Sequence, residues 1–587
     1  MKTSILFICT FIINFLIAQN PSFEWAKKIG GEYNDFVTSV ALDATGNIYT
    51  IGYFKGTVDF DPSDNQTLNL TSIGTSNNIF ISKLDPDGNL IWVKSIGGSL
   101  REREANFIEL DAFGNIYISG YFNGTTDFDP SSDVFYLTAN LTNFYNNVNV
   151  FLLKLDANGN FLWVKNLGET DDYETHTIKT DLFGNIYVSG RFKNTVDFDP
   201  GEDVFNLSVG VGSIFISKLD KDGNLLWVKN TVGGGEDSNL GKIFMDIDAS
   251  HNIYLTGIFS GVTDFDPGEN VTNLSSGSIP CIFLLKLDPN GNFLWVKNMN
   301  QDAYEGPNSV KVDPFGNIYI MGGFTGEIDC DPGEGVAILQ GGLVQLDTNV
   351  FYAPQNTFIS KFDTDGDFIW VKGKAAETDR TLKNLHIDSY GNVYETGIFE
   401  GTVDFDSGPD SLIISSVGSY DIYILKIDID GNIVWVKTIG GIQNESSGSI
   451  AVDQSGNIYT TGGFKFICEF DPALETFNII FSQGATDGFI HKMSQNSELG
   501  IMEIKHTQNL VNVYPNPTND ILNIDIKILN DEDKKMELIN SLGQIVINKS
   551  IDNKHLEIDT KHLTNGVYFL KVFNDNKILT TEKIIIK

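Results

Sequence analysis

One short motif recurs seven times along the 587-residue chain and constrains its fold more than any other feature. The first copy runs from Asp43 to Tyr49, with Gly46 in its turn, and is followed by Gly52 and Phe54. The other six copies begin at Asp111, Asp181, Asp248, Asp313, Asp388 and Asp453. The turn positions 46 and 456 are 410 residues and six intervals apart, which gives about 68 residues per repeat. A fixed period of this kind indicates a repeat architecture in which each copy is one structural unit.

Each repeat is expected to form four short β-strands, at residues 38–42, 47–54, 79–84 and 90–96 in the first copy. A turn of the form Asp-x-x-Gly-Asn joins the first strand to the second, and another joins the third to the fourth. Glycine can take a positive φ in such a turn, and the Asp side chain can bond the turn backbone, which favours a tight hairpin. Short strands at regular spacing, without helical periodicity, predict an all-β protein.

The strands that carry tryptophan indicate how the array closes. A strand with Trp25 precedes the first repeat, whereas the last repeat has a third strand at 489–493 and no tryptophan strand after it. Pairing these two strands would remove the open sheet edges that a linear array exposes. The sequence therefore predicts a seven-bladed β-propeller over residues 23–493 that is closed by the N-terminal strand.

The repeat pattern also resembles a known family. In the first six copies, Asp-x-x-Gly-Asn-Ile-Tyr is followed by a Lys-Leu-Asp-x-x-Gly-Asn block and then by Trp-Val-Lys, with small variations. This pattern resembles the bacterial seven-bladed propeller repeats called SBBP, over about residues 23–493. That family is defined by its fold, so the resemblance implies no shared catalytic activity.

Residues 1–18 have the pattern of a signal peptide: Lys2 is followed by an apolar run at 5–17 and the small residue Ala18. The run is too short for a comfortable membrane span. No later segment is apolar enough to span a bilayer. We therefore expect export to the periplasm and a mature chain without a transmembrane segment.

The period breaks after the seventh repeat. Residues 494–509 are polar and unpatterned and are expected to form a linker, and residues 510–587 are expected to form a small β-sandwich domain. The motif residues of this last segment are Tyr514, Pro515, Asn516, Pro517, Gly543, Gly566 and Tyr568. Their three blocks resemble the type A C-terminal sorting domain of the type IX secretion system of Bacteroidetes. The resemblance implies passage through the outer membrane by that machinery, removal of this domain, and release or attachment to the cell surface. An unrelated β-sandwich appendage is the alternative.

The charge balance excludes one class of partner. The formal net charge is −37, and a nucleic-acid-binding protein needs clustered cations instead. An acidic surface favours solubility and disfavours anionic partners. The cysteines beyond the leader, Cys281, Cys330 and Cys468, show no metal-ligand spacing and are expected to be small buried hydrophobes.

Paired acids follow each Gly-x-Phe segment and give a candidate metal site. The pairs in the first three repeats are Asp59 with Asp61, Asp127 with Asp129, and Asp197 with Asp199. Residues two apart on a strand share a face, so both carboxylates could serve one Ca²⁺ ion. The alternative is a capped turn in which these side chains accept hydrogen bonds from nearby backbone N–H groups. No copy has the full spacing of an EF-hand loop.

Residues that differ between repeats are the better candidates for function, because a residue present in every blade serves the scaffold by default. The variable stretches lie between one tryptophan strand and the next blade, and between the second and third strands. Both connections emerge on the same face of a four-stranded blade. The candidate ligand-binding residues on that face are Arg101, Glu104, Asp172, Glu174, Asp237, Tyr304, Glu305, Asp379, Arg380 and Glu445. Ordinary solvated loops are the alternative.

The sequence contains none of the common catalytic motifs, with no HExxH, GxSxG or P-loop. The leading hypothesis is a secreted or cell-surface propeller that binds a glycan or protein ligand without catalysis. The alternative is a secreted carbohydrate-active enzyme, a glycosidase or lyase, that uses two acids on the variable face. A passive structural surface protein is a third possibility.

Overall fold

The computed structural model describes residues 20–495 and 511–587, with internal gaps. The gaps are 64–65, 75, 99–103, 140–148, 170–172, 234–241, 278, 300–305, 342–343, 348–349, 353–355, 375–379, 407–410, 472–477, 516–517, 519, 527–533, 541–544, 552–554 and 575–576. The chain divides into two compact units, Met1–Ser497 and Glu498–Lys587. The expected signal peptide, and the expected linker beyond residue 495, lie outside the described residues.

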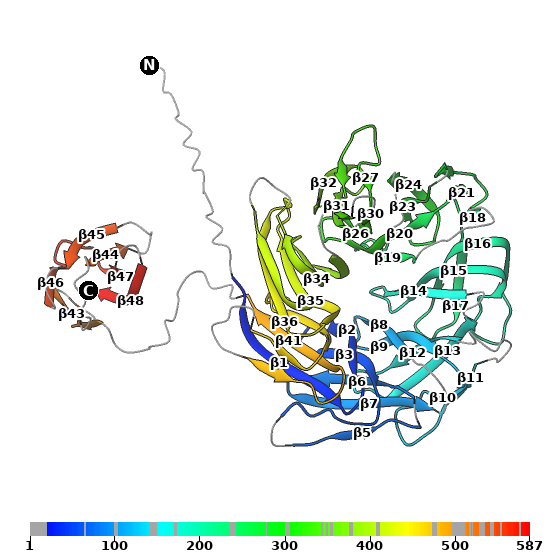
Figure 1. The fold of residues 1–587 in the computed structure, drawn as a ribbon, viewed down its shortest axis with the longest axis horizontal. Coiled ribbons are helices and arrows are strands. Elements are labelled where there is room, and N and C mark those ends of the chain that lie inside the picture. Colours follow the sequence, from blue (N-terminus) through cyan, green and yellow to red (C-terminus); the bar gives the residue numbers. More distant parts are fainter. Residues whose placement is uncertain are drawn as a thin grey trace, which may run out of the picture. The chain divides into compact units, whose positions relative to one another are not determined.

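The described part of the first unit consists of strands and turns, and its main strands form seven antiparallel four-stranded sheets (Figure 1), which we call blades 1 to 7. From the innermost strand outwards, blade 1 contains β2 (Phe36–Leu42), β3 (Ile48–Phe54), β6 (Asn78–Leu84) and β7 (Leu90–Gly98); blade 2 contains β8 (Glu104–Leu110), β9 (Ile116–Phe122), β12 (Asn149–Leu155) and β13 (Phe161–Glu169); and blade 3 contains β14 (Tyr173–Thr180), β15 (Ile186–Asp197), β16 (Asn206–Leu219) and β17 (Leu225–Asn230). Blade 4 contains β19 (Phe244–Ile247), β20 (Ile253–Phe259), β23 (Cys281–Leu287) and β24 (Phe293–Met299), and blade 5 contains β25 (Pro307–Val312), β26 (Ile318–Phe324), β31 (Asn356–Phe362) and β32 (Phe368–Lys374). Blade 6 contains β33 (Arg380–Ile387), β34 (Val393–Asp404), β35 (Ile413–Ile427) and β36 (Ile433–Gly441), and blade 7 contains β37 (Ser446–Val452), β38 (Ile458–Phe464), β41 (Asp487–Ser494) and β1 (Ser22–Gly31). An all-β chain of repeated four-stranded sheets is consistent with a β-propeller.

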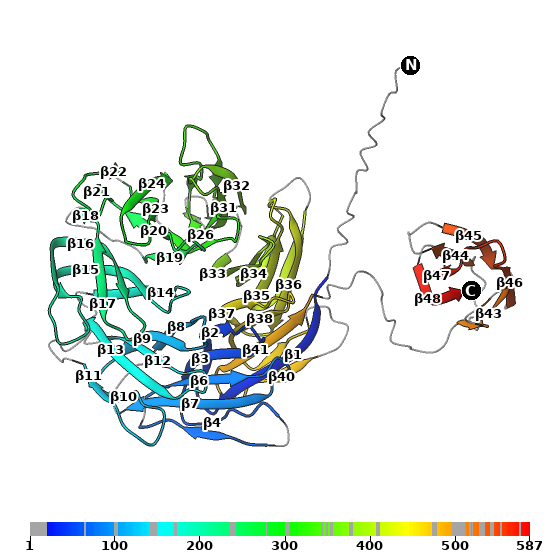
Figure 2. The same cartoon turned by 180° about the vertical axis from the view of Figure 1, so that it is seen from behind.

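Blade 7 contains both ends of the array. Its outermost strand, β1, pairs antiparallel with β41, with Lys28 opposite Phe489 and Ala26 opposite His491. The strand that precedes the first repeat thus lies where the last repeat lacks one. The same pairing, of the N-terminal blue strand with orange β41, can be followed from behind in Figure 2.

The innermost strands contact one another in a closed cycle. Strand β2 contacts β8, and the contacts continue in order through β14, β19, β25, β33 and β37, which returns to β2. Each Asp-x-x-Gly-Asn turn after an innermost strand therefore belongs to one ring of turns around the axis of the unit.

In several repeats a short outer hairpin pairs with the end of the blade before it. In the first repeat, β4 (Thr57–Asp59) and β5 (Asn69–Thr71) extend the sheet of blade 7, because Gly30 and Gly31 of β1 pair with Asp59 and Val58. The corresponding hairpins are β10 (Thr125–Asp127) with β11 (Tyr136–Thr138) on β7; β21 (Val262–Asp264) with β22 (Asn273–Ser275) on β18 (Val232–Gly233); β27 (Glu327–Asp329) with β28 (Ile338–Gln340); and β39 (Ile467–Glu469) with β40 (Ile479–Phe481) on β36. Strands β29 (Val344–Asp347) and β30 (Val350–Tyr352) form a further hairpin in the long insertion of the fifth repeat.

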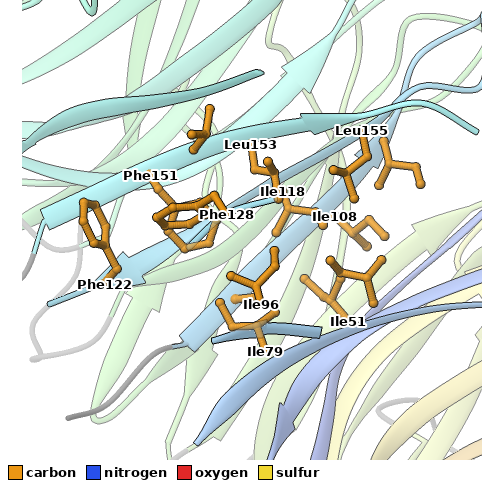
Figure 3. Close-up of a cluster of buried hydrophobic side chains, with 14 of the residues drawn as sticks. Ile51, Ile79, Ile96, Ile108, Ile118, Phe122, Phe128, Phe151, Leu153 and Leu155 are labelled. Carbon is orange, nitrogen blue, oxygen red and sulfur yellow. The ribbon is translucent and has the colours of Figure 1, made fainter. Parts of the chain in front are cut away.

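The hydrophobic core is divided among the interfaces between blades. Between blades 1 and 2, Ile51 and Ile79 face Ile118 and Phe151, and all four are fully buried (Figure 3). The alternate residues of the same strands face the other way: Ile48 of blade 1 packs in one cluster with Ile490 of blade 7. Burial on both faces of each sheet explains why the strands contain runs of apolar residues rather than a simple alternation.

The C-terminal unit has two antiparallel sheets. One contains β42 (Val511–Tyr514), β43 (Ile521–Ile526) and β46 (His555–Asp559), and the other contains β45 (Ile545–Ile551), β44 (Lys534–Asn540), β47 (Gly566–Asn574) and β48 (Lys577–Ile586). Buried Leu522 and Ile524 from the first sheet share one core with Leu538 and Leu570 from the second. Within the part of the chain that the structure describes, no helix has the length and apolar character needed to cross a bilayer.

Candidate ligand-binding surfaces

The repeated Asp-x-x-Gly-Asn turns are closed by their own side chains. Asp43 Oδ1 accepts hydrogen bonds from the backbone N–H groups of Thr45 and Asn47, at 2.9 and 3.0 Å. Its Oδ2 accepts from Asn47 Nδ2 at 2.8 Å and from the Tyr49 hydroxyl at 3.3 Å. These bonds hold the pKa of Asp43 below its ordinary value although burial opposes the shift. The repeated Asp, Asn and Tyr are therefore scaffold residues.

A repeated lysine packs over each such tyrosine, and in several repeats it also bonds to the next blade. Lys154 Nζ lies 4.9 Å from the centre of the Tyr117 ring and donates a 2.7 Å hydrogen bond to the Lys221 carbonyl in blade 3. The Trp163 indole N–H donates to the same carbonyl at 3.3 Å, and Tyr117 packs edge-on against Trp163. These groups are used in the interface between blades and are not free for a ligand.

The paired acids of the outer hairpins bond to backbone. Asp59 Oδ1 accepts from the N–H groups of Asp61 and Leu68 at 3.1 and 2.8 Å, and Asp61 Oδ1 accepts from Ser63 N–H at 2.9 Å. The pairs Asp127 with Asp129 and Asp197 with Asp199 make the same bonds. This is the capped-turn geometry of the alternative interpretation. Among the described residues, no three His, Cys, Asp or Glu side chains are grouped as metal ligands would be.

The variable face that the sequence favours is only partly described. Arg101, Asp172, Asp237, Tyr304, Glu305 and Asp379 lie outside the described residues. Glu104, Glu174 and Arg380 lie at the beginning of the innermost strands β8, β14 and β33. Their backbones pair with Tyr121, Arg191 and Phe399, respectively. Their placement on these strands does not test their role, so these nine residues stay a prediction.

The tenth predicted residue, Glu445, is only 1% exposed and does not present its carboxylate at the surface. Gly441 N–H donates to Glu445 Oε2 at 3.0 Å, while Oε1 has no hydrogen-bond partner among the described residues. Burial, and to a smaller extent Asp421, raises the pKa of Glu445 to about 8, and burial also raises the pKa of Asp421. Sequence position placed this acid on a variable loop, but the loop folds back over β36.

Like Glu445 and Asp421, the acids Asp35 and Asp487 form a buried pair, at the corresponding place beside blade 7. Asp35 accepts from Gly31 N–H at 2.7 Å and from Lys55 N–H at 2.9 Å, and burial raises its pKa to about 7. Asp487, which further raises that pKa, accepts from Gln483 N–H at 2.8 Å. Both pairs brace the loops that connect neighbouring blades.

A charged cluster on the innermost strands escaped the sequence analysis. Lys179 Nζ lies 3.3 Å from both carboxylate oxygens of Glu109 and 3.5 Å from Asp246 Oδ1. Burial opposes the charge on Lys179, but the two carboxylates hold its pKa above the ordinary value. Lys179 and burial together lower the pKa of Lys311, and burial and Lys311 lower the pKa of His386 to about 4. Ion pairs thus connect blades 2, 3 and 4, and the charges of the cluster also act on Lys311 of blade 5 and His386 of blade 6.

The cluster did leave a signal in the sequence. Each member stands two residues before the repeated turn Asp, at a position where the first and seventh repeats have Ala41 and Ala451. The expectation that function lies where repeats differ applies to this position as well as to the connecting loops. Recognising the cluster requires knowing that the seven innermost strands meet around one axis.

The remaining predicted residues lie in the C-terminal unit or in the core. Tyr514 is 42% exposed and precedes Pro515, while buried Tyr568 donates a 2.7 Å hydrogen bond to the Thr564 carbonyl and follows Gly566. Asn516, Pro517 and Gly543 lie outside the described residues. Cys281, Cys330 and Cys468 are buried free thiols, which confirms the expectation from their spacing.

The C-terminal segment matches a known protein family. Residues 512–587 match the family described as the secretion system C-terminal sorting domain. A chain that carries this domain is exported through the type IX secretion system to the outer surface or the medium, so this is a secreted all-β repeat protein.

The chain also has distant relatives. It is 22% identical over 551 residues to a WD repeat-containing protein of Acanthamoeba polyphaga mimivirus; the match covers 81% of this chain and only 38% of that protein. Among solved structures, PorZ, a surface component of the type IX secretion system of Porphyromonas gingivalis, is 12% identical with a TM-score of 0.22, over 93% of this chain and 91% of PorZ. The extracellular domain of a one-component system of B. thetaiotaomicron is 10% identical with a TM-score of 0.19, over 94% of this chain and 81% of that domain. TM-scores this low carry no functional argument.

Proposed function

We propose that the chain is a seven-bladed propeller, closed by its N-terminal strand, that binds a glycan or protein ligand outside the cell without catalysis. The observation that carries the proposal is that one chain contains both a sorting domain at 512–587 and a ring of blades. The repeated polar side chains of that ring make hydrogen bonds to other groups of the ring. An exported scaffold of this kind can present non-repeated residues at its two rims, while the repeated residues keep the blades in register.

The alternative is a carbohydrate-active enzyme with two acids. Glu445 favours it, because a carboxylic acid with a pKa near 8 has the protonation that a general acid needs at neutral pH. Its low exposure opposes it, because a general acid must reach the glycosidic oxygen. The binding function is therefore preferred.

The test uses the purified full chain on a panel of polysaccharides and a matched enzymatic assay. Retention of a polysaccharide without release of reducing ends supports binding without catalysis. Turnover that Glu445→Gln abolishes would establish the enzymatic alternative. Charge-neutral substitution of the predicted Glu104, Glu174 and Glu305 should weaken retention if the variable face holds the ligand.

Occupation of the paired acids by Ca²⁺ is a separate proposal. Support for it is limited to the oxygen chemistry of the six carboxylates at Asp59, Asp61, Asp127, Asp129, Asp197 and Asp199, which suits a hard cation. Calorimetry at millimolar Ca²⁺ measures it directly, and a flat titration would reject it.

A further inference from the structure

The ring of turns around the axis carries large exposed aromatic side chains in four of its seven blades. Two residues after the turn Asp, blades 2, 3, 5 and 6 have Phe113, Phe183, Phe315 and Tyr390, which are 68%, 69%, 63% and 74% exposed. The other blades have the small polar residues Thr45, Ser250 and Ser455 at this position. A side chain that stabilised every turn equally would not alternate between large aromatic and small polar, so these rings need another explanation.

Some of these residues reach the turn of the neighbouring blade. A carbon of the Phe113 ring lies 3.6 Å from the place that a Cβ on Gly184 would occupy, so this ring reaches the turn of blade 3. The rings of Phe183 and His251 are 5.4 Å apart, so Phe183 likewise reaches the turn of blade 4. The turn of blade 6 lies against that of blade 5, because a Cβ on Gly391 would lie 3.5 Å from Asp313 Oδ2. The Tyr319 hydroxyl of β26 also donates a 3.3 Å hydrogen bond to the Gly391 carbonyl. We call Phe113, Phe183, His251, Phe315 and Tyr390 the aromatic rim.

His251 gives a second, independent sign of a ligand. It replaces the glycine of the other six turns and takes a φ of 63°, a strained conformation for a side-chain-bearing residue. Its Nε2 is buried and has no hydrogen-bond partner among the described residues. A strained residue with an unpaired buried polar atom is typical of functional positions.

The turns that carry the rim are rigid before any ligand binds. Asp181, for example, accepts bonds from Phe183 N–H at 3.0 Å, from Asn185 N–H at 2.9 Å and from Asn185 Nδ2 at 2.8 Å. Just inside the turns, the partly exposed side chains of Glu109, Lys179 and Asp246 offer charged hydrogen-bonding groups. Preformed flat platforms beside polar groups lower the entropy lost on binding.

We propose that the aromatic rim binds a neutral oligosaccharide, whose sugar rings lie on Phe113, Phe183, Phe315 and Tyr390, with the His251 ring packed beside Phe183. This rests on the proposed ligand-binding function, and it places the site on the face opposite the variable loops. The choice of a neutral ligand follows from the net charge of −37 and from the Asp residue in each rim turn, which repel polyanions. A sugar polymer fits better than a protein because the rings stand singly, about one per blade, and do not merge into one broad apolar patch.

Affinity electrophoresis of the full chain in gels that contain xylan, β-glucan or mannan tests the inference, with alginate as the anionic comparison. Phe183→Ala should weaken retention by a neutral polysaccharide about tenfold, which corresponds to the loss of one aromatic platform. His251→Gly should also weaken it, and because it restores the glycine of the other turns it should leave folding intact. The matched control is Val336→Ala, which removes a 72% exposed side chain away from the rim.

The outcomes separate the inference from the function on which it rests. If a neutral polysaccharide retains both rim variants as strongly as the wild type, the rim is not the binding site, but the binding function still holds. Retention by alginate alone, or capture of a protein without any polysaccharide, would overturn the choice of a neutral sugar. No retention by any polysaccharide and no protein partner would overturn both.

Discussion

Lys492 Nζ donates a 2.9 Å hydrogen bond to the Pro86 carbonyl, across 406 residues of sequence. It is the bond that Lys154 makes to the Lys221 carbonyl at 2.7 Å inside the array, here formed between blade 7 and blade 1. The seam where the two ends of the repeat unit meet therefore has the same lysine bond as the interface between blades 2 and 3.

Lys492→Met should destabilise the repeat unit by about 1–2 kcal/mol, because it removes a charged hydrogen bond and leaves a carbonyl without its partner. Chemical denaturation of the mature chain measures the change. Lys154→Met is the control within the array. A loss at Lys154 with none at Lys492 would mean that the seam contributes nothing to stability.

Gly88→Ala should be more harmful than Gly74→Ala. Both glycines have a positive φ, 81° and 72°, so both substitutions carry the backbone penalty of about 1 kcal/mol. Only at Gly88 would the new Cβ meet a ring, 3.0 Å from the Trp25 indole, whereas nothing lies within 4 Å at Gly74. The difference in melting temperature isolates the contact between Trp25 and the turn. Equal shifts would show that β1 is not held against this turn.

Glu445→Gln should stabilise the repeat unit at pH 8 and have little effect near pH 4. The pKa of Glu445 is about 8 in the fold and near 4.5 when exposed, so folding takes up a proton between these values. The contribution of Glu445 to stability is therefore present below pH 4.5 and falls as pH rises towards 8, by at most about 1.4 kcal/mol per pH unit. Denaturation curves at several pH values measure the slope. The control is Glu334→Gln, which changes an exposed acid.

Lys179→Met should destabilise the fold by about 1–3 kcal/mol, because Glu109 and Asp246 would lose the cation that pairs with both of them. The loss of the Lys179 charge should also raise the pKa of Lys311, which Lys179 now lowers. Lys221→Met is the matched control: its 2.8 Å pair with Asp222 is exposed and should change stability by under about 0.5 kcal/mol. An effect at Lys179 as small as the control would show that the cluster is not a unit.

Asp59→Ala should weaken the outer hairpin by about 1 kcal/mol because two backbone N–H groups lose their acceptor. If the acids serve only as caps, millimolar Ca²⁺ should leave the melting temperature of the wild type unchanged. A rise with Ca²⁺ that Asp127→Ala removes would establish the metal site instead.

The sequence predicted the parts of the fold that repeat. The Asp43 turn and the pairing of the Trp25 strand with the strand of Phe489 follow from local spacing and from strand counting. The burial of Glu445 and the charged cluster at Lys179 could not be predicted in the same way, because they depend on how one blade lies against the next. The exposure of Phe113 and Phe183 also needed coordinates, because an aromatic residue in a turn can point inwards as easily as outwards.

The outer hairpin β4–β5 sits on β1 of the preceding blade, so the covalent repeat and the folded blade are out of phase. A fragment that contains one sequence repeat would keep an outer hairpin but not the blade on which that hairpin lies. It would also lack the outer hairpin that extends its own blade. Gain or loss of a whole period would therefore alter two neighbours at once. We expect circular permutants that open the ring inside a hairpin loop to fold more readily than permutants opened between a hairpin and its blade.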